Sequence, residues 1–453
     1  MALIQNILTK IKQARSKPLL RSAAYGAASS GVNTCILLVG NALYVYVLGA
    51  EQYGTLAIIL SFAQLMQLGN LGLGYGVTKL CREKPELTRQ YLYTGLIISI
   101  IPVFTIAIAY RFGGTAISGF FGRINGLKAG TAALLALSAF LASLALINDF
   151  IGGILNGLGR IEAANNGAVV SKSGSVLLAA SFLCFPGFRS YAAVAVASCI
   201  TGLFAMAYQL WNVSRLAEPG SLIPIWPRSS HYSAIFKASG GVAFGGMVSV
   251  LIFPFARLSI ASAAGASQVA LYDLLIKFSF ALRGLFELAL RAFIREFAPG
   301  KVSIESRRAL YKKTNMWIRR ISPAFWIVLL LCLDTFIYVF KHRLRLDGSM
   351  GVAYGCALAI SIATTAKLLN IPSYFWLIAN GKTGQVFLSH LLNAIAHILC
   401  GIFIVHIAAH FACLSFCIAF ALSSVAALIV LEVAAAREPD QTFTSQVAAE
   451  PQY

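Results

Sequence analysis

Apolar runs of 18 or more residues recur along the whole chain, and no other feature restricts its fold as strongly. A helix needs about 20 such residues to cross the hydrocarbon core of a bilayer. The composition agrees, because 58% of the 453 residues are hydrophobic, only 11% are charged, and the mean hydropathy is +0.77. An ordinary soluble domain does not have these values, and the segments are too long for an outer-membrane barrel. We therefore expect an all-α polytopic membrane protein.

The order of the apolar runs predicts about twelve transmembrane helices in two six-helix lobes around a central cavity. The clearest break in composition lies at residues 216–237, which contain three prolines and an adjacent pair of serines. Such a segment is typical of a linker between halves. The expected parts are a basic amphipathic segment (1–21), an N-lobe of helices 1–6 (22–215), the cytoplasmic linker (216–237), a C-lobe of helices 7–12 (238–436) and a polar cytoplasmic tail (437–453).

The formal net charge of +20 has a simple explanation in membrane topology. Lys and Arg accumulate in cytoplasmic loops, and with both termini inside, the cytoplasmic segments hold about 24 of the 36 basic residues. Shifting the topology by one helix inverts this bias. We therefore expect both termini in the cytoplasm, and no nucleic acid as a partner.

The stretch from residue 241 to residue 277 carries the most informative charges. It reads as two spanning helices joined by a tight turn at residues 262–266, with Arg257 in the first and Asp273 and Lys277 in the second. Each charge at bilayer depth costs about 2.5–3.5 kcal/mol even on lenient insertion scales. Three of them in one hairpin predict a polar or watery cavity beside these helices.

The same hairpin occurs earlier in the chain. The sequence GAEQ from Gly49 parallels GASQ from Gly265, a spacing of about 216 residues. This register places Asn41 in the first hairpin at the position of Arg257 in the second, and Ser61 at the position of Lys277. Repeated halves with a site near the midplane are common in secondary transporters.

The first hairpin also resembles a known family. Its sequence, VYVLGAEQYGTLAIILSFAQLMQLGNLGLGYGVTKL (residues 45–80), resembles the opening hairpin of the polysaccharide and O-antigen flippases, through LG at 48–49, EQYG at 51–54 and GLG at 72–74. Their superfamily also holds multidrug and toxic-compound extruders and lipid II flippases. The resemblance implies export of a lipid-linked oligosaccharide of the undecaprenyl-pyrophosphate type across the bacterial inner membrane for surface polysaccharide assembly. A polysaccharide polymerase and chain-length machinery are the partners it implies.

The polar residues inside the apolar segments are the candidates for the site. Cations and amides suit a pyrophosphate and sugar hydroxyls, and the candidates for substrate binding are Arg257, Lys277, Lys172, Lys367, Arg283, Asn41 and Gln64. The candidates for ion coupling or charge pairing are Asp273, Asp149, Asp334, Glu287 and His397. Salt bridges are the competing interpretation, from Arg257 to Asp273 or Asp149, and within one helix for Lys277 with Asp273 and for Arg283 with Glu287.

Histidines and cysteines give weaker signals. His390, Asn393 and His397 share a helical face, which suits a metal ion or a proton relay but also ordinary packing. The nine cysteines sit almost entirely in apolar segments without a CxxC pair, and Cys413 and Cys417 are four residues apart. We interpret the cysteines as small packing residues and expect neither disulfides nor a metal site.

These features favour a flippase that works by alternating access, and they leave alternatives open. The chain has no Walker A, GxSxG or HExxH motif, so we expect no enzyme and no cofactor, with a proton or sodium gradient as the energy source. A multidrug or cation extruder of the same superfamily is the first alternative. A membrane polysaccharide polymerase or ligase is the second, disfavoured because the longest expected external loop, residues 111–127, is small.

Overall fold

The computed structural model describes residues 18–66, 73–123, 131–216, 225–291, 297, 303–346, 349–380, 382–407 and 411–437. Most of the expected basic N-terminal segment, nearly all of the polar tail and part of the expected linker lie outside these residues. The described chain is almost entirely helical, without strands. Its longer helices are α2 (Pro18–Met66), α3 (Leu73–Glu83), α4 (Thr88–Arg123), α5 (Thr131–Gly157), α6 (Ile161–Cys184), α7 (Tyr191–Leu216), α8 (Ser229–Ala264), α9 (Ala266–Arg291), α11 (Ile304–Phe340), α12 (Met350–Leu369), α13 (Ile371–Ala379), α14 (Thr383–Ile407) and α15 (Ala412–Ala436). Short 3₁₀ turns, η2 (Pro85–Leu87) and η3 (Pro186–Phe188), lie between α3 and α4 and between α6 and α7.

Eight of the described helical stretches are long and apolar enough to span a membrane, and Val250–Ala264 of α8 is a shorter apolar stretch. Helix α2 is divided at Gly49 into two arms, and α12 and α13 follow each other with only Asn370 between them. Counting the second arm of α2 with α3 and α12 with α13, the described helices give twelve crossings. The chain is therefore a multi-pass all-α membrane protein, as the apolar runs predict.

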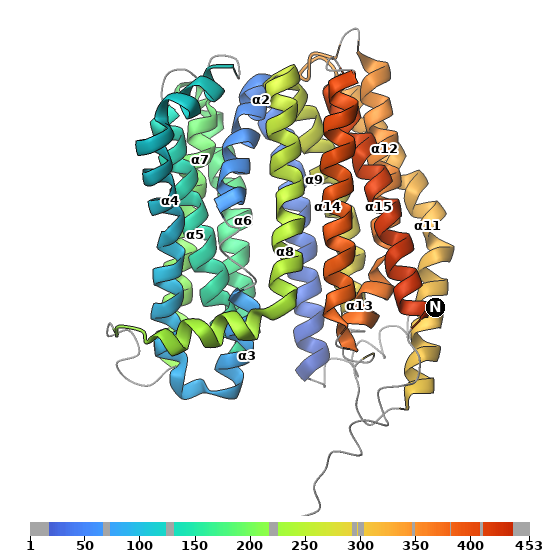
Figure 1. Cartoon of the computed structure of the whole chain (residues 1–453). Helices are drawn as coiled ribbons and strands as arrows, with labels where there is room; N and C mark the ends of the chain where they lie inside the picture. Colours follow the sequence, from blue (N-terminus) through green and yellow to red (C-terminus); the bar gives the residue numbers. More distant parts are fainter. Residues whose placement is uncertain are drawn as a thin grey trace, which may run out of the picture.

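The helices form two groups with α2 and α8 between them (Figure 1). Helices α4 to α7 lie on one side and α11 to α15 on the other. The first half of the chain is joined to the second mainly by packing of α2 on α9 and of α3 on α8. The central position of α2, α8 and α9 brings the two sequence hairpins into contact.

Two glycines make the hairpins. Gly49 has φ 76° and ψ 172°, and Gly265 has φ 83° and ψ 176°. This region of backbone space is essentially restricted to glycine, because a Cβ atom would clash there. The turn expected at residues 262–266 and its repeat at Gly49 are therefore confirmed, with nearly the same backbone geometry.

The hairpins also approach each other very closely. A Cβ atom added to Gly54 in the second arm of α2 would lie 1.8 Å from the carbonyl oxygen of Ala266 at the start of α9. Small residues allow helices in a membrane to pack with their backbones in contact. This approach sets the distance across which polar side chains of α2 and α9 meet.

Some expected loops are helical instead. The prediction of an external loop at 111–127 is wrong for residues 111–123, because α4 continues through Arg123. This stretch has little charge, so it is compatible with an apolar environment, where helical hydrogen bonds satisfy the backbone. Helix α11 begins at Ile304, well before its apolar part, and Ser303 caps it by accepting a hydrogen bond from the Ser306 N–H.

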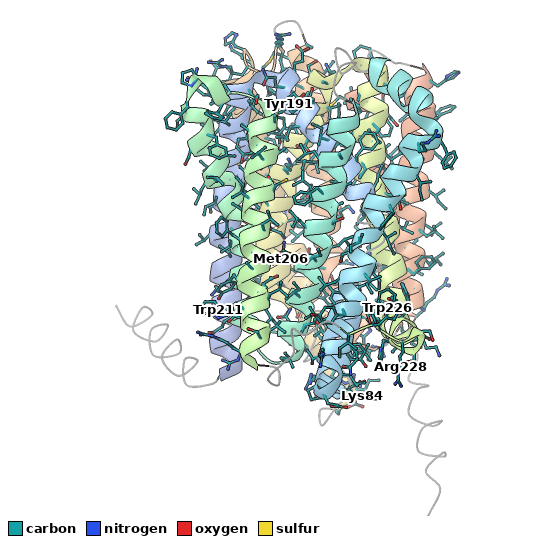
Figure 2. All side chains as sticks on the ribbon, turned by 90° about the vertical axis from the view of Figure 1, so that its left-hand side faces the viewer. Lys84, Tyr191, Met206, Trp211, Trp226 and Arg228 are labelled. Atoms are coloured by element: carbon teal, nitrogen blue, oxygen red, sulfur yellow. The ribbon has the colours of Figure 1, made fainter. Side chains whose placement is uncertain are left out.

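The segment before α8 is partly helical as well. Helix α8 begins at Ser229, inside the expected linker, and its first turns run across the lower end of the bundle before the helix rises (Figure 1). Trp226, just before this helix, is 86% exposed. Figure 2 places Trp226 and Arg228 at this end of the molecule, near Lys84.

Candidate functional site

The polar centre of the protein is a charge triad of Arg257, Asp273 and Lys277. Arg257 Nη2 lies 2.6 Å from Asp273 Oδ1, and Lys277 Nζ lies 2.7 Å from Asp273 Oδ2. Helix α8 supplies Arg257, and α9 supplies the other two, whose four-residue spacing puts them on one helical face. The Gly265 turn folds α8 against α9, so that one carboxylate pairs with two cations and the triad keeps one positive charge.

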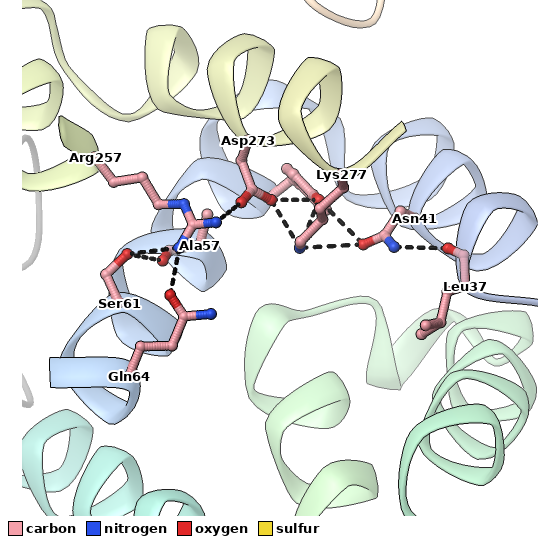
Figure 3. A network of polar contacts seen from close by, with 9 residues as sticks. Leu37, Asn41, Ala57, Ser61, Gln64, Arg257, Asp273 and Lys277 are labelled. Atoms are coloured by element: carbon pink, nitrogen blue, oxygen red, sulfur yellow. Dashed lines mark hydrogen bonds and ion pairs between the residues drawn. The ribbon is translucent and has the colours of Figure 1, made fainter. Parts of the chain in front are cut away.

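Side chains of α2 complete the coordination of the triad (Figure 3). Arg257 Nη1 donates to Gln64 Oε1 at 2.7 Å and to Ser61 Oγ at 3.4 Å. Lys277 Nζ donates to Asn41 Oδ1 at 3.3 Å and to Tyr53 Oη at 3.1 Å. Both arms of α2 therefore contact charges of the second hairpin.

Tyr53 is the site residue that the sequence argument missed. Its hydroxyl donates to Asp273 Oδ2 at 2.7 Å, and the side chain is almost completely buried. Tyr53 lies in the EQYG run that carries the family resemblance, and that run was the available signal. In a sequence with 17 tyrosines, only the fold distinguishes a tyrosine that binds a buried carboxylate from one that packs.

A cavity of about 510 Å³ lies beside the triad. Its charged and amide-bearing lining residues are Asn41, Gln64, Arg257 and Lys277, and most of the remaining lining is apolar, including Leu56, Phe253 and Phe280. Residues of α2, α6, α7, α8 and α9 line it, so both halves of the chain contribute. A largely apolar pocket of this size with a few polar groups is typical of a ligand site.

Exposure separates the roles of the two cations. The side chain of Arg257 is 5% exposed and that of Asp273 is 1% exposed, whereas that of Lys277 is 29% exposed. Arg257 is thus held mainly by protein groups, although its Nε has no hydrogen-bond partner among the described residues. Lys277 is the cation with the most surface available to a molecule in the cavity.

Four of the seven expected binding residues, Asn41, Gln64, Arg257 and Lys277, meet at this cavity. The other three do not line it. Lys172 is exposed on α6, and Arg283 forms an ion pair with Glu287 at 2.8 Å along α9. Lys367 of α12 lies with its Nζ 5.1 Å from the centre of the Phe420 ring.

The expected coupling residues are also spread out. Asp273 belongs to the triad, while Asp149 is exposed on α5 and Asp334 is partly buried on α11. His397 of α14 is buried against Phe416 and Phe420, and neither ring nitrogen has a hydrogen-bond partner among the described residues. Of the salt bridges in the competing interpretation, Lys277 pairs with Asp273 and Arg283 with Glu287, and Arg257 pairs with Asp273, the first of the two partners considered for it.

Comparison with known proteins shows the fold but not a family. No protein-family model matches the sequence, and no curated protein matches it. Solved transporter structures do match. An inward-facing multidrug resistance MATE family transporter of the MOP superfamily has a TM-score of 0.68 and 12% identity, over 89% of this chain and 94% of that one.

Two further structures extend the comparison. The lipid II flippase MurJ, in an inward closed conformation, has a TM-score of 0.66 and 10% identity, over 92% of this chain and 88% of that one. A MOP superfamily transporter from Pyrococcus furiosus, whose binding pocket of reverse polarity suggests a different function, has a TM-score of 0.58 and 15% identity, over 92% and 94%. The chain is thus a multi-pass membrane protein with the fold of MOP superfamily transporters.

Proposed function

We propose that this protein is an alternating-access transporter that carries an anionic, lipid-linked substrate across the membrane. The observation that carries the proposal is the charge triad of net charge +1, whose two cations, Arg257 and Lys277, line the 510 Å³ cavity. The more specific form of the proposal, which rests on the family resemblance, is a flippase for lipid-linked oligosaccharides in the bacterial inner membrane. The fold does not determine on which side of the membrane the two termini lie. We propose that both lie in the cytoplasm.

The charge of the triad favours an anion. An isolated cation in a partly dehydrated site is costly, and a phosphate that enters the cavity supplies the missing counter-charge. Lys277 is the group in position to bind it, because it keeps surface on the cavity while Asp273 holds it in place. Asn41 and Gln64 add amide groups that suit hydroxyls and phosphate oxygens.

The apolar part of the wall suits a substrate with a hydrocarbon portion. Leu37, Leu56, Leu60, Phe253 and Phe280 line the cavity beside the polar groups. A lipid-linked sugar needs both kinds of surface, a polar one for its head and an apolar one for the first part of its chain. This combination separates the proposed substrate from a small inorganic anion.

Movement of the substrate follows from where the cavity lies. It is bounded by helices of both halves, so relative rocking of the halves changes its access. A proton or sodium gradient is our proposal for the energy source. Asp273 contacts Arg257 of α8, Lys277 of α9 and Tyr53 of α2. A proton or sodium ion that binds to this carboxylate would weaken these contacts between the two hairpins.

A multidrug or cation extruder is the second candidate. It is favoured by the similarity to MATE transporters and by the buried carboxylate of Asp273, which a cationic drug could contact if it displaced Lys277. The two candidates differ in the sign of the substrate charge. An anionic substrate binds to Lys277, whereas a cationic one competes with it.

Transport in vesicles distinguishes the candidates. The purified protein is reconstituted in proteoliposomes, and translocation is measured for a fluorescent undecaprenyl-pyrophosphate-linked sugar and for the cation ethidium under an imposed proton or sodium gradient. We expect translocation of the lipid-linked sugar that decreases in Lys277→Gln. Uptake of ethidium without movement of the lipid would replace the flippase proposal with the extruder.

A further inference from the structure

Three cysteines that the proposed transport does not use form a cluster within the C-terminal group of helices. Cys356 of α12 and Cys413 and Cys417 of α15 each have 0% exposure, and their Sγ atoms all lie within 4.8 Å of one another. The four-residue spacing places Cys413 and Cys417 on one face of α15. That face packs against α12, so the third thiol meets the other two across the helix interface.

The distances between the sulfurs suit a bound metal ion. Cys356 Sγ and Cys413 Sγ are 3.6 Å apart. With a metal–sulfur bond of about 2.3 Å, the sulfurs of a tetrahedral site are about 3.8 Å apart and those of a trigonal site about 4.0 Å apart. Small side-chain rotations therefore bring three thiols at these separations onto one metal ion without moving a helix.

We propose that these three cysteines bind a soft metal ion, copper(I), in a three-coordinate site that joins α12 to α15. Thiolate ligands without carboxylates or imidazoles select soft ions such as copper(I) and zinc. Structural zinc sites almost always have four ligands, and the described residues offer three at this place. Three sulfurs are enough for copper(I).

Binding of the ion is coupled to the loss of thiol protons. A cysteine ligates a metal ion as its thiolate, so three S–H bonds break, three copper–sulfur bonds form, and three protons leave to solvent. No oxidant or reductant enters this step.

Metal content tests the proposal. The full chain is produced in copper-supplemented cells, purified without oxygen in a reductant that does not bind copper, washed with a weak chelator, and analysed for copper per chain. We expect about one copper ion per chain in the wild type and a loss of at least about tenfold in Cys356→Ala, Cys413→Ala and Cys417→Ala. Cys184→Ala and Cys332→Ala, which remove exposed thiols, are the matched controls and should retain it.

X-ray absorption on the wild type keeps the test independent of whether the variants fold. We expect a copper(I) edge and a first shell of about three sulfurs near 2.3 Å. A wild type without copper, a first shell of nitrogen or oxygen, or a triple cysteine variant that keeps the wild-type copper content would each overturn the proposal. A mass loss of two hydrogens, showing a Cys356–Cys413 disulfide in place of the metal, would overturn it as well.

Discussion

Asn41 Oδ1 lies 3.3 Å from Lys277 Nζ, and this contact has a counterpart elsewhere in the site. In the repeat register, Asn41 corresponds to Arg257 and Ser61 corresponds to Lys277. Ser61 accepts a hydrogen bond from Arg257. When the two hairpins are exchanged in this register, the pair Asn41–Lys277 therefore becomes the pair Arg257–Ser61. That exchange is what a two-fold relation between the hairpins produces.

The two hairpins share geometry but not charge. The first contributes neutral groups, Asn41, Ser61 and Gln64, and the second contributes the three charges of the triad. Ala57 stands in the first hairpin at the position that Asp273 occupies in the second. A symmetrical backbone therefore presents an asymmetric, net positive site, in which Arg257 is held by protein groups and Lys277 keeps surface on the cavity.

Asp273→Asn should destabilise the protein strongly. The substitution leaves Arg257, whose side chain is 5% exposed, without a counter-charge in a buried site, and breaking a buried pair from one side costs about 3–5 kcal/mol. Thermal unfolding in detergent measures the loss. The matched control is the double variant Arg257→Gln with Asp273→Asn, in which no buried guanidinium remains unpaired and much of the stability returns. Equal melting temperatures for the wild type and Asp273→Asn would contradict this account.

The residues that carry charge or a special backbone conformation could be identified from the sequence. A charge in an apolar run is costly wherever it lies, which singles out Arg257, Asp273 and Lys277 before any fold is known. The tight turn and its repeat follow from glycine and from internal similarity, and Gly49 and Gly265 confirm both. These signals depend on local chemistry, which the sequence contains.

The distribution of the candidates over the fold could not be predicted. Lys172 and Lys367 are as improbable in an apolar segment as Lys277 is, yet Lys172 is exposed on α6 and Lys367 lies beside Phe420. Which face of a helix meets the cavity depends on packing against other helices. The same limit explains the missed Tyr53 and the three cysteines, whose meeting requires that α12 lie against α15.

Gly265→Ala should lower stability by about 1–3 kcal/mol, because a residue with a Cβ atom is strained at φ 83° and ψ 176°. Gly49→Ala, at nearly the same angles, should have a similar effect. Gly284→Ala in α9 is the control: outside its own helical turn, no atom of the described residues lies within 4 Å of its added Cβ, and alanine in a helix is favoured over glycine by about 0.5–1 kcal/mol. The melting temperatures of the three variants test this prediction. Equal melting temperatures for Gly265→Ala and Gly284→Ala would show that the turn at Gly265 does not require glycine.

Lys277→Gln should reduce transport with little effect on folding. Its side chain is 29% exposed and lines the cavity, and Arg257 remains to balance Asp273 in the variant. We expect a rise in the half-saturating substrate concentration of about tenfold or more, since a charge-assisted bond to a phosphate contributes about 1.5–3 kcal/mol. Lys172→Gln changes the same residue type on the exposed part of α6 and should transport normally. Equal losses in the two variants would show that general charge, rather than the cavity, matters.

His231 should make stability depend on pH through the start of α8. Its Nδ1 accepts a hydrogen bond from the Arg228 N–H at 3.1 Å, outside the apolar part of the helix, and partial burial together with the Arg228 charge lowers the pKa of His231 below its ordinary 6.5. Between the folded and unfolded pKa values the unfolded chain binds more protons, so this contribution is present above about pH 6.5 and is lost as the pH falls through the folded pKa. His231→Phe keeps a ring beside Tyr91 but cannot titrate. Between pH 7 and pH 5, which lie on either side of about 6.5, the melting temperature of this variant should fall less than that of the wild type. Parallel curves for the two proteins would show that His231 does not contribute to acid sensitivity.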